Sequence, residues 1–288
     1  MYAIAGVTGQ VGGSMARALL KNGHAVRAVI RDTAKAAPWE ALGAEIAIAD
    51  LGDEAALTEA FAGSQGAFVM IAPDFAPEPG FPGARRQAAA QANALANAKP
   101  GKVVALSSVG GQRESGLGLI TQVHIFEAAL AELDLPTAIL RPAWFMENSQ
   151  WDIAPARETG RMPSFLQPLD RPYPMVATAD IGKMGAQVLT QNWTGRRVIE
   201  IEGPTRYSQH ELAVLLGKAL GRPVEASLVP RETWEAVFKS QGTAWPQPRI
   251  EMVDGFNSGW IVFEPGKHEH VIGDTPFEAV LADLVKRA

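Results

Sequence analysis

The chain has 288 residues, of which 47% are hydrophobic and 20% charged, with a net charge of −5 and no cysteine. This is the composition of a globular protein that can bury a substantial core, and it excludes a disordered or collagen-like chain. The lack of cysteine also excludes disulfides, thiolate nucleophiles and cysteine-ligated metal or iron–sulfur sites.

The chain carries no block of lysine or arginine, which argues against nucleic acid as a partner. No run approaches the roughly 18 apolar residues of a membrane-spanning helix. The first residues, "MYAIAGVTGQVGG", lack the basic and apolar regions of a signal peptide and pass directly into a strand pattern. We therefore expect a cytoplasmic protein that acts on a small molecule and that can form a homodimer.

In the first half of the chain, short apolar runs alternate with longer helical segments. Strands that are apolar on both faces and separated by helices predict a parallel sheet covered on both sides, the doubly wound α/β (Rossmann) fold. The pattern predicts strands over 2–7, 25–30, 44–49, 67–72, 102–107 and 136–141. It predicts helices over 11–22, 53–62, 83–98 and 120–133.

After Arg141 proline becomes frequent, which favours loops with one short helix near 152–158. Further on, Asp180 is placed to cap a helix over 180–191, and Ser208 and Glu211 have the spacing of a capping box. We expect a cofactor-binding domain over 1–150, with segments near 176–200 returning to it, and a smaller α+β substrate-binding lobe over 151–288. The remaining predicted elements are strands over 197–203 and 224–229 and helices near 208–221, 231–241, 246–258 and 276–287.

A glycine-rich turn, "GVTGQVGG", links the first predicted strand to the first predicted helix. Gly6 permits a tight turn, Gly9 lets backbone N–H groups approach a pyrophosphate, and Gly12 lets the helix pack closely on the strand. Gly13 is an extra glycine. In this strand–turn–helix context the spacing predicts a dinucleotide-binding site.

The end of the second predicted strand, "AVIRDTAK", bears on the choice of cofactor. Arg31 ends this strand and Lys35 follows one turn later, so a 2′-phosphate would find positive partners and NADP(H) is favoured over NAD(H). A shift of one residue would instead place Asp32 there, and Arg31 can also be a solvated strand-end charge. Asp50, after the third strand, either accepts a hydrogen bond from adenine or caps the next helix.

Two loops follow the fourth and fifth strands at their carboxyl ends, where ligands of open α/β sheets collect. They are "MIAP" (70–73) and "LSSVGG" (106–111). We expect the residues of both loops that face the crevice to contact cofactor: Ile71, Ala72, Pro73, Ser107 and Ser108.

The glycine turn, Arg31 and above all "LPTAILRPAWFMEN" (135–148) resemble the NmrA-like branch of the atypical short-chain dehydrogenase/reductase superfamily, and the resemblance covers nearly the whole chain. The family includes NADPH-dependent quinone, azo-dye and triphenylmethane reductases, isoflavone-reductase-like enzymes and NADP-binding redox sensors. The resemblance implies that Trp144, Phe145 and Asn148 border the nicotinamide and the substrate. It implies cofactor contacts at Gly6, Thr8, Gly9, Gln10, Val11, Gly12, Arg31, Asp50 and the 71–73 loop.

The Tyr-x-x-x-Lys dyad of typical short-chain dehydrogenases is missing, because residues 6, 177 and 211, four after the three tyrosines, are not lysine. Many NmrA-like chains carry a lysine or histidine on the fifth helix, and His124 takes that place here. His124 is a general acid or a partner of the nicotinamide ribose, a residue that frames the pocket, or a plain helix residue bonded to Glu127.

Two functions remain open. The first is an NADPH-dependent reductase that moves hydride to a quinone-like or other flat conjugated acceptor, and the second is a non-catalytic NADP(H)-binding sensor with a protein partner. "KHEH" (267–270), expected on a loop, offers histidines at i and i+2 but no third ligand, so no metal site is predicted.

Overall fold

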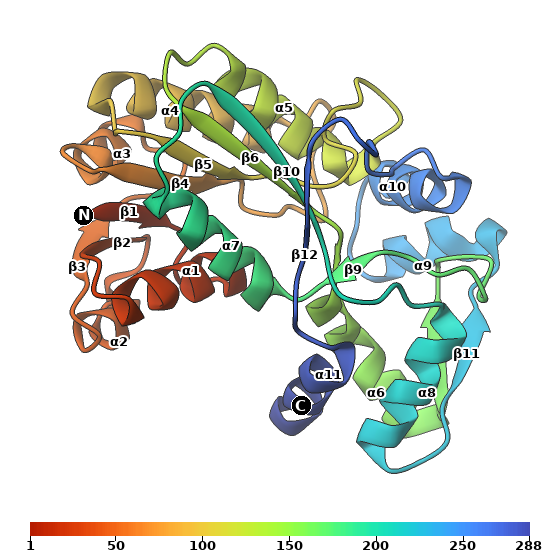
Figure 1. The fold of residues 1–288 in the computed structure, drawn as a ribbon. Helices are drawn as coiled ribbons and strands as arrows, with labels where there is room; N and C mark the ends of the chain where they lie inside the picture. The colour runs from red at the N-terminus through yellow and green to blue at the C-terminus, as the bar shows by residue number, and fades with distance from the viewer.

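The apolar segments of the first half form the centre of one parallel sheet (Figure 1). The computed structural model describes all 288 residues, and its main sheet has eight strands in the order β12-β10-β6-β5-β4-β1-β2-β3. The predicted doubly wound α/β fold is thus confirmed. The strands of this sheet are β1 Tyr2–Ala5, β2 Val26–Ile30, β3 Glu45–Ile48, β4 Gly66–Met70, β5 Val103–Leu106, β6 Thr137–Pro142, β10 Arg196–Glu202 and β12 Glu269–Ile272.

The order of the strands reverses between β1 and β4, because β2 and β3 lie on one side of β1 whereas β4 and the later strands lie on the other. In open α/β sheets a crevice forms outside the carboxyl ends of the strands at such a reversal. The glycine turn follows β1 at that point.

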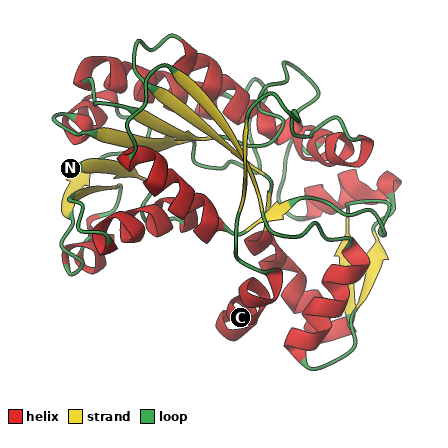
Figure 2. Ribbon diagram, viewed as in Figure 1, coloured by secondary structure: helices red, strands yellow, loops and turns green.

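Helices cover both faces of the sheet (Figure 2). Helices α1 and α7 pack together on one face, while α3, α4 and α5 cover the other. Alternation along β1 serves both layers, because Tyr2 and Ile4 join one hydrophobic core and Ala3 and Ala5 join the other. These helices are α1 Gln10–Lys21, α3 Glu54–Phe61, α4 Pro82–Ala98, α5 Thr121–Ala131 and α7 Thr178–Thr190, and the short α2 spans Ala37–Glu40.

The proline-rich segment after Arg141 contains more regular structure than its composition predicts. Two small parallel sheets form there, one from β7 and β9 and the other from β8 and β11. Their strands make non-local pairs, which a local pattern of residues does not reveal. The strands are β7 Trp144–Phe145, β8 Arg161–Ser164, β9 Met175–Val176 and β11 Glu225–Leu228.

The second half of the chain adds five further α-helices, and α6, α8 and α11 pack against one another below the sheet (Figure 1). The capping box predicted for α8 is confirmed, since Ser208 and Glu211 bond each other's backbone N–H groups. None of the protein's helices combines the length and apolar character needed to cross a bilayer. These five helices are α6 Gln150–Thr159, α8 Gln209–Leu220, α9 Trp234–Ser240, α10 Gln247–Ser258 and α11 Phe277–Arg287, and a 3₁₀ turn, Arg231–Thr233, precedes α9.

Two local predictions are wrong. The "KHEH" segment is a loop only in its first half, because Glu269 and His270 begin β12, which pairs with β10 at the edge of the sheet. Asp180 does not cap α7, because the helix begins two residues earlier, at Thr178. Its carboxylate instead accepts hydrogen bonds from the backbone N–H and the hydroxyl of Thr275.

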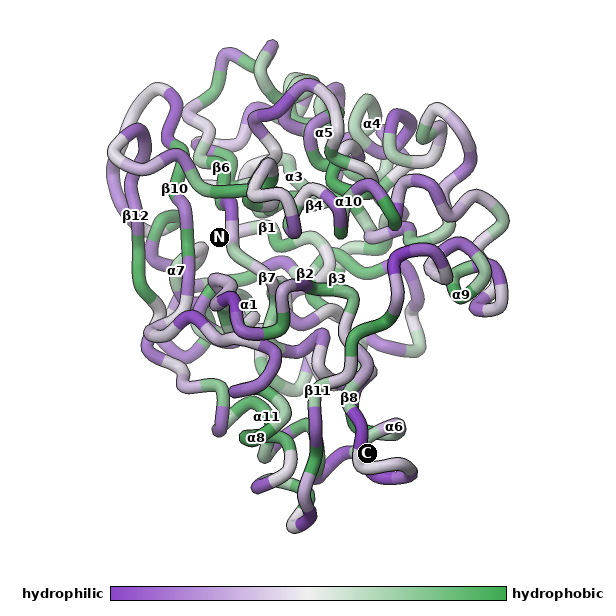
Figure 3. Tube along the Cα trace, turned by 90° about the vertical axis from the view of Figure 1, so that its right-hand side faces the viewer, coloured by the Kyte–Doolittle hydropathy of each residue, from purple (hydrophilic) through white to green (hydrophobic).

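Hydropathy follows this architecture. The central strands of the sheet are largely hydrophobic in Figure 3, and many peripheral loops are hydrophilic. Polar side chains buried along β6 and β10 depart from this pattern, and they belong to the candidate site described below.

Candidate cofactor site and catalytic groups

The glycine turn after β1 has the geometry of a phosphate cradle. Gly6 has a φ of +66°, which an L side chain rarely adopts. A Cβ on Gly12 would lie 2.5 Å from the carbonyl oxygen of Gly6, so this glycine permits the close packing of α1 on β1. A Cβ on Gly9 would meet only that same oxygen, at 3.3 Å, which leaves the outer face of the turn open to a ligand.

The amino end of α1 faces this turn and is suited to an anion. Gly9 is the N-cap residue and offers no side chain to the first turn of the helix, and that turn contains no acidic residue. Unpaired backbone N–H groups and the helix dipole both favour negative charge at such an end. Thr8, Gly9 and Gln10 are exposed around the turn, whereas Val11 and Gly12 are buried beneath it. The residues present therefore fit a dinucleotide pyrophosphate.

The end of β2 places two basic side chains and two acidic ones close together. Arg31 is 82% exposed and its Nη1 atom lies 3.9 Å from Asp50 Oδ2. Asp32 is engaged locally, because its carboxylate accepts a hydrogen bond from the N–H of Ala34 and caps a short 3₁₀ turn that contains Lys35. The Asp32 carboxylate therefore turns toward its own backbone.

Asp50 does not cap the helix that follows it. That cap is Asp53, whose carboxylate accepts a hydrogen bond from the N–H of Ala56, while Asp50 accepts one from the N–H of Gly52. The capping alternative for Asp50 is thus wrong, and its carboxylate remains 56% exposed beside Arg31.

The loop after β4 is held in place from α4. The side-chain oxygen of Gln87 accepts a hydrogen bond from the N–H of Ala72, and the amide of Gln91 donates one to the carbonyl of Met70. Ile71 is buried and Pro73 is exposed. This loop is therefore preformed at the carboxyl edge of the sheet.

The loop after β5 is held by α5. Ser107 is buried and its hydroxyl donates a hydrogen bond to Glu127, and Ser108 donates to the carbonyl of Val109. His124 lies one turn before Glu127, and its Nδ1 atom is 3.0 Å from the carbonyl oxygen of Gly111. A carbonyl only accepts, so Nδ1 carries a proton and Nε2 is left free to act.

His124 and Glu127 do not bond each other, so the bond expected between them is wrong. Glu127 instead accepts two hydrogen bonds from Arg141, at 3.0 Å to Nε and 2.6 Å to Nη2. The Arg141 side chain is 7% exposed and that of Glu127 12%. The arginine of the "LRP" motif therefore ties the end of β6 to α5.

A chain of charged groups continues from Arg141 across the edge of the sheet, and the sequence did not predict it. Arg141 Nη1 lies 3.6 Å from the carboxylate of Glu264, which also contacts His268 at 3.0 Å. Glu200, 1% exposed in β10, accepts a hydrogen bond from the N–H of Glu264. His270 of β12 bonds Glu202 of β10 at 2.9 Å. Burial alone would raise the pKa of Glu202, but Arg206 and His270 outweigh this effect, so the pKa of Glu202 is lowered.

The "FMEN" segment turns out to contain a helix cap. The Glu147 carboxylate accepts hydrogen bonds from the N–H of Thr178, at 2.9 Å, and from its hydroxyl, at 2.6 Å, and so caps α7 from 31 residues away. Burial raises the pKa of Glu147, although these hydrogen bonds oppose the shift.

The three aromatic and amide residues implied as the substrate border lie at the start of the lobe. Trp144 and Phe145 form β7 and are half-buried, as is Asn148 one turn later. The Trp144 ring packs edge-on against Phe256 of α10, with ring centres 5.2 Å apart. The segment therefore presents partly exposed apolar surface near the point where the chain leaves β6.

Asp152 is a further titratable group on α6, one turn after Asn148. Burial raises the pKa of Asp152 to about 7, although a hydrogen bond with Ser149 opposes the shift. No pattern in the sequence marks this carboxyl group, because its surroundings come from tertiary packing.

None of the three tyrosines stands in for the missing dyad. Tyr2 begins β1, at the opposite edge of the sheet from the glycine turn, and packs against His24. Tyr173 donates its hydroxyl proton to the carbonyl of Gln167, and Tyr207 stacks on Phe277 in the lobe. The structure contains no group of three or more histidine, cysteine or acidic residues arranged to hold a metal ion.

The sheet, the reversal of strand order and the glycine turn define a Rossmann-type α/β protein. Residues 2–252 match the model of the NmrA-like family, and the chain belongs to that family. The expected family resemblance is thereby confirmed.

The relatives of the chain include reductases. It is 28% identical over 246 residues to quinone oxidoreductase 2 of Escherichia coli (strain K12), covering 84% of this chain and 82% of that protein. It is 24% identical over 277 residues to the NAD(P)H azoreductase of Xenophilus azovorans, covering 96% and 92%. The crystal structure of an NADPH-dependent quinone oxidoreductase from Escherichia coli, complexed with NADPH, matches with a TM-score of 0.78 at 26% identity, covering 100% of this chain and 99% of that one.

Proposed function

We propose that the protein is an NADPH-dependent reductase that transfers hydride to a quinone-like or other flat conjugated small molecule. The observation that carries the proposal is the open glycine cradle at the point where the strand order reverses, where the positive φ of Gly6 and the close packing at Gly12 both disfavour a side chain. The relatives named for quinone and azo-dye reduction support the reaction class.

Different segments of the chain bind the cofactor and the substrate. Gly9 and the first turn of α1 take the pyrophosphate through backbone N–H groups. The loop around Ile71, Ala72 and Pro73 and the loop containing Ser107 and Ser108 form the walls at the carboxyl edge. Trp144, Phe145 and Asn148 offer the partly apolar surface that a flat substrate needs.

Reduced nicotinamide supplies the hydride in this class of reaction. A quinone that accepts hydride becomes a hydroquinone anion, and water can supply the proton that completes it. Such a reaction needs no tyrosine with a lowered pKa, which agrees with the absence of the Tyr-x-x-x-Lys dyad. The same absence disfavours reduction of simple ketones, whose alkoxide product requires a proton donor during the reaction.

His124 frames the substrate pocket in this proposal. Its Nδ1–H is committed to the carbonyl of Gly111, and its Nε2 can accept a hydrogen bond from a ribose or substrate hydroxyl. The Ser107 hydroxyl donates its hydrogen bond to Glu127 and is not available as a donor to substrate. The side chains therefore orient ligands, and the proton comes from solvent.

The cofactor preference rests on Arg31 and Lys35, which bring two positive charges to the end of β2. We expect tighter binding of NADPH than of NADH, and a smaller difference in Arg31→Ala. Equal affinities in the wild-type protein that do not change in the variant would remove the basis for this preference.

The reaction is tested by single-turnover oxidation of bound NADPH against a panel of quinones and azo dyes. We expect at least one quinone to oxidise the cofactor faster than it oxidises free NADPH at the same concentration. Tight cofactor binding without accelerated oxidation by any acceptor would contradict the enzyme and support a redox sensor that acts through a protein partner.

A further inference from the structure

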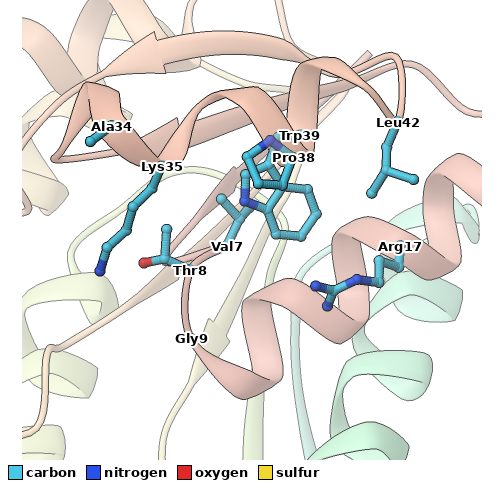
Figure 4. A pocket seen from close by; sticks show the side chains of 9 residues that line it. All are labelled: Val7, Thr8, Gly9, Arg17, Ala34, Lys35, Pro38, Trp39 and Leu42. Carbon is cyan, nitrogen blue, oxygen red and sulfur yellow. The ribbon is translucent and has the colours of Figure 1, made fainter.

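A pocket of about 340 Å³ lies between the glycine turn, α1 and the segment that contains α2 (Figure 4). Ligand pockets for small molecules start at roughly 300 Å³, so this one suits a phosphate group with part of its sugar, and it is too small for a whole dinucleotide. Two basic residues, Arg17 and Lys35, line it together with Thr8 and Gly9, and no acidic residue does.

Both cations in this pocket are free to bind an anion. Neither Arg17 nor Lys35 donates a hydrogen bond or forms an ion pair within the protein, whereas Arg31 lies beside Asp50 and is not part of the pocket lining. Figure 4 places the Lys35 side chain beside Thr8 and the Arg17 guanidinium across the pocket beneath Trp39. Two uncompensated positive charges in one concavity favour a doubly charged ligand.

Arg17 is held in place by its neighbours. Its guanidinium lies over the ring of Trp39, 4.9 Å from the ring centre, and Trp39 is 4% exposed. A cation on an aromatic face keeps its edge N–H groups free for a phosphate. The aromatic ring therefore orients the guanidinium without using its donors.

The extra glycine of the turn, Gly13, lies beneath both the turn and Arg17. It lies within α1 and has no unusual backbone angle, so its role is spatial. A Cβ at this position would lie 2.8 Å from the carbonyl oxygen of Val7, 3.0 Å from Nη1 of Arg17 and 3.7 Å from the ring of Trp39. The closest of these atoms is backbone, so Gly13 lets α1 pack against the turn, and a side chain there would also crowd the guanidinium.

We propose that Arg17 and Lys35 form a subsite for the 2′-phosphate of NADPH, and that Arg17 determines specificity for the phosphorylated cofactor. This inference rests on the proposed function, because it assumes that a nicotinamide dinucleotide occupies the glycine turn. It adds a residue of α1 to the basic residues at the end of β2.

The test is isothermal titration of NADPH and NADH into the wild-type protein, Arg17→Ala and the control Lys21→Ala. Lys21 is exposed on the same helix one turn further on, so its loss changes the net charge equally without touching the pocket. In Arg17→Ala we expect NADPH affinity to fall by about 10- to 100-fold, as for loss of a charged hydrogen bond. NADH affinity should stay within about twofold, because its 2′-hydroxyl carries no charge for the cation to bind. Lys21→Ala should change neither affinity.

The outcomes separate this inference from the proposed function. A wild-type protein that binds neither dinucleotide overturns the proposed function itself. If the wild-type protein binds NADPH but Arg17→Ala weakens NADPH and NADH equally, or weakens neither, only the assignment of Arg17 is overturned. Retained NADH affinity in the variants shows that the site is still folded.

Discussion

Replacing Arg141 by methionine removes both hydrogen bonds that its guanidinium donates to Glu127. The methionine fills much of the same space, but the Glu127 carboxylate stays in a setting where its side chain is only 12% exposed and keeps Ser107 as its donor. Breaking a buried ion pair from one side costs about 3–5 kcal/mol, because the remaining charge is left uncompensated.

The expected shift in melting temperature follows from the size of the chain. An unfolding entropy of about 2.1 cal/mol/K per residue gives about 0.6 kcal/mol/K for 288 residues. A loss of about 3–5 kcal/mol therefore lowers the melting temperature by about 5–8 °C. Differential scanning calorimetry of the wild-type protein and Arg141→Met measures this directly.

A double variant and a surface control sharpen the result. Glu127→Met combined with Arg141→Met should cost about 2 kcal/mol less than the two single changes added together, because no isolated charge remains. Arg231→Met removes a similar two-point contact with Asp254, but both side chains are more than 40% exposed, so we expect a loss of at most about 1 kcal/mol. A shift below about 2 °C in Arg141→Met, or full additivity in the double variant, would refute the reasoning.

Three further changes test other parts of the structure. Burial raises the pKa of Asp152 to about 7, so its contribution to stability is present below the unfolded pKa near 3.8 and is lost as the pH rises toward 7. Asp152→Asn should therefore raise the melting temperature at pH 8 but not at pH 4. An equal effect at both pH values would contradict this. Glu147→Ala removes the cap of α7 at Thr178 and should lower the free energy of unfolding by about 1–2 kcal/mol in urea titrations, whereas an unchanged midpoint would exclude a capping role. His124→Ala should lower turnover by less than about tenfold; a loss of about 100-fold or more would identify His124 as a general acid.

The sequence predicted the fold well where the signal is local. Apolar strands alternating with helices predicted the first six strands along the chain and the doubly wound fold, and the glycines predicted the turn after β1. The capping box at Ser208 was also found, because both partners lie within one helical turn. In each case residues close in sequence determine the structure.

Predictions failed where the partner is distant in sequence. The cap of α7 is Glu147, 31 residues before Thr178, so Asp180 looked like the better candidate. β12 is a short edge strand with polar residues, and only its pairing with β10 defines it. Glu127 was paired with its helical neighbour His124, whereas Arg141 reaches it from the adjacent strand. Such contacts leave little trace in the spacing of residues.

One of these distant contacts, between Arg141 and Glu127, does leave a signal in the sequence. An arginine in an otherwise apolar strand, as in "TAILRP", requires a buried acidic partner, and Glu127 is an acid on the neighbouring helix.

The central claim is that this chain transfers hydride from NADPH to a quinone without a tyrosine–lysine pair. The most direct measurement mixes the NADPH-loaded protein with a naphthoquinone in a single turnover, once with ordinary NADPH and once with NADPH deuterated at the transferred position. We expect oxidation faster than that of free NADPH, slowed clearly by the deuterium and little affected by deuterated water. An oxidation rate no faster than that of free NADPH, or one insensitive to deuterium on the cofactor but strongly slowed in deuterated water, would contradict it.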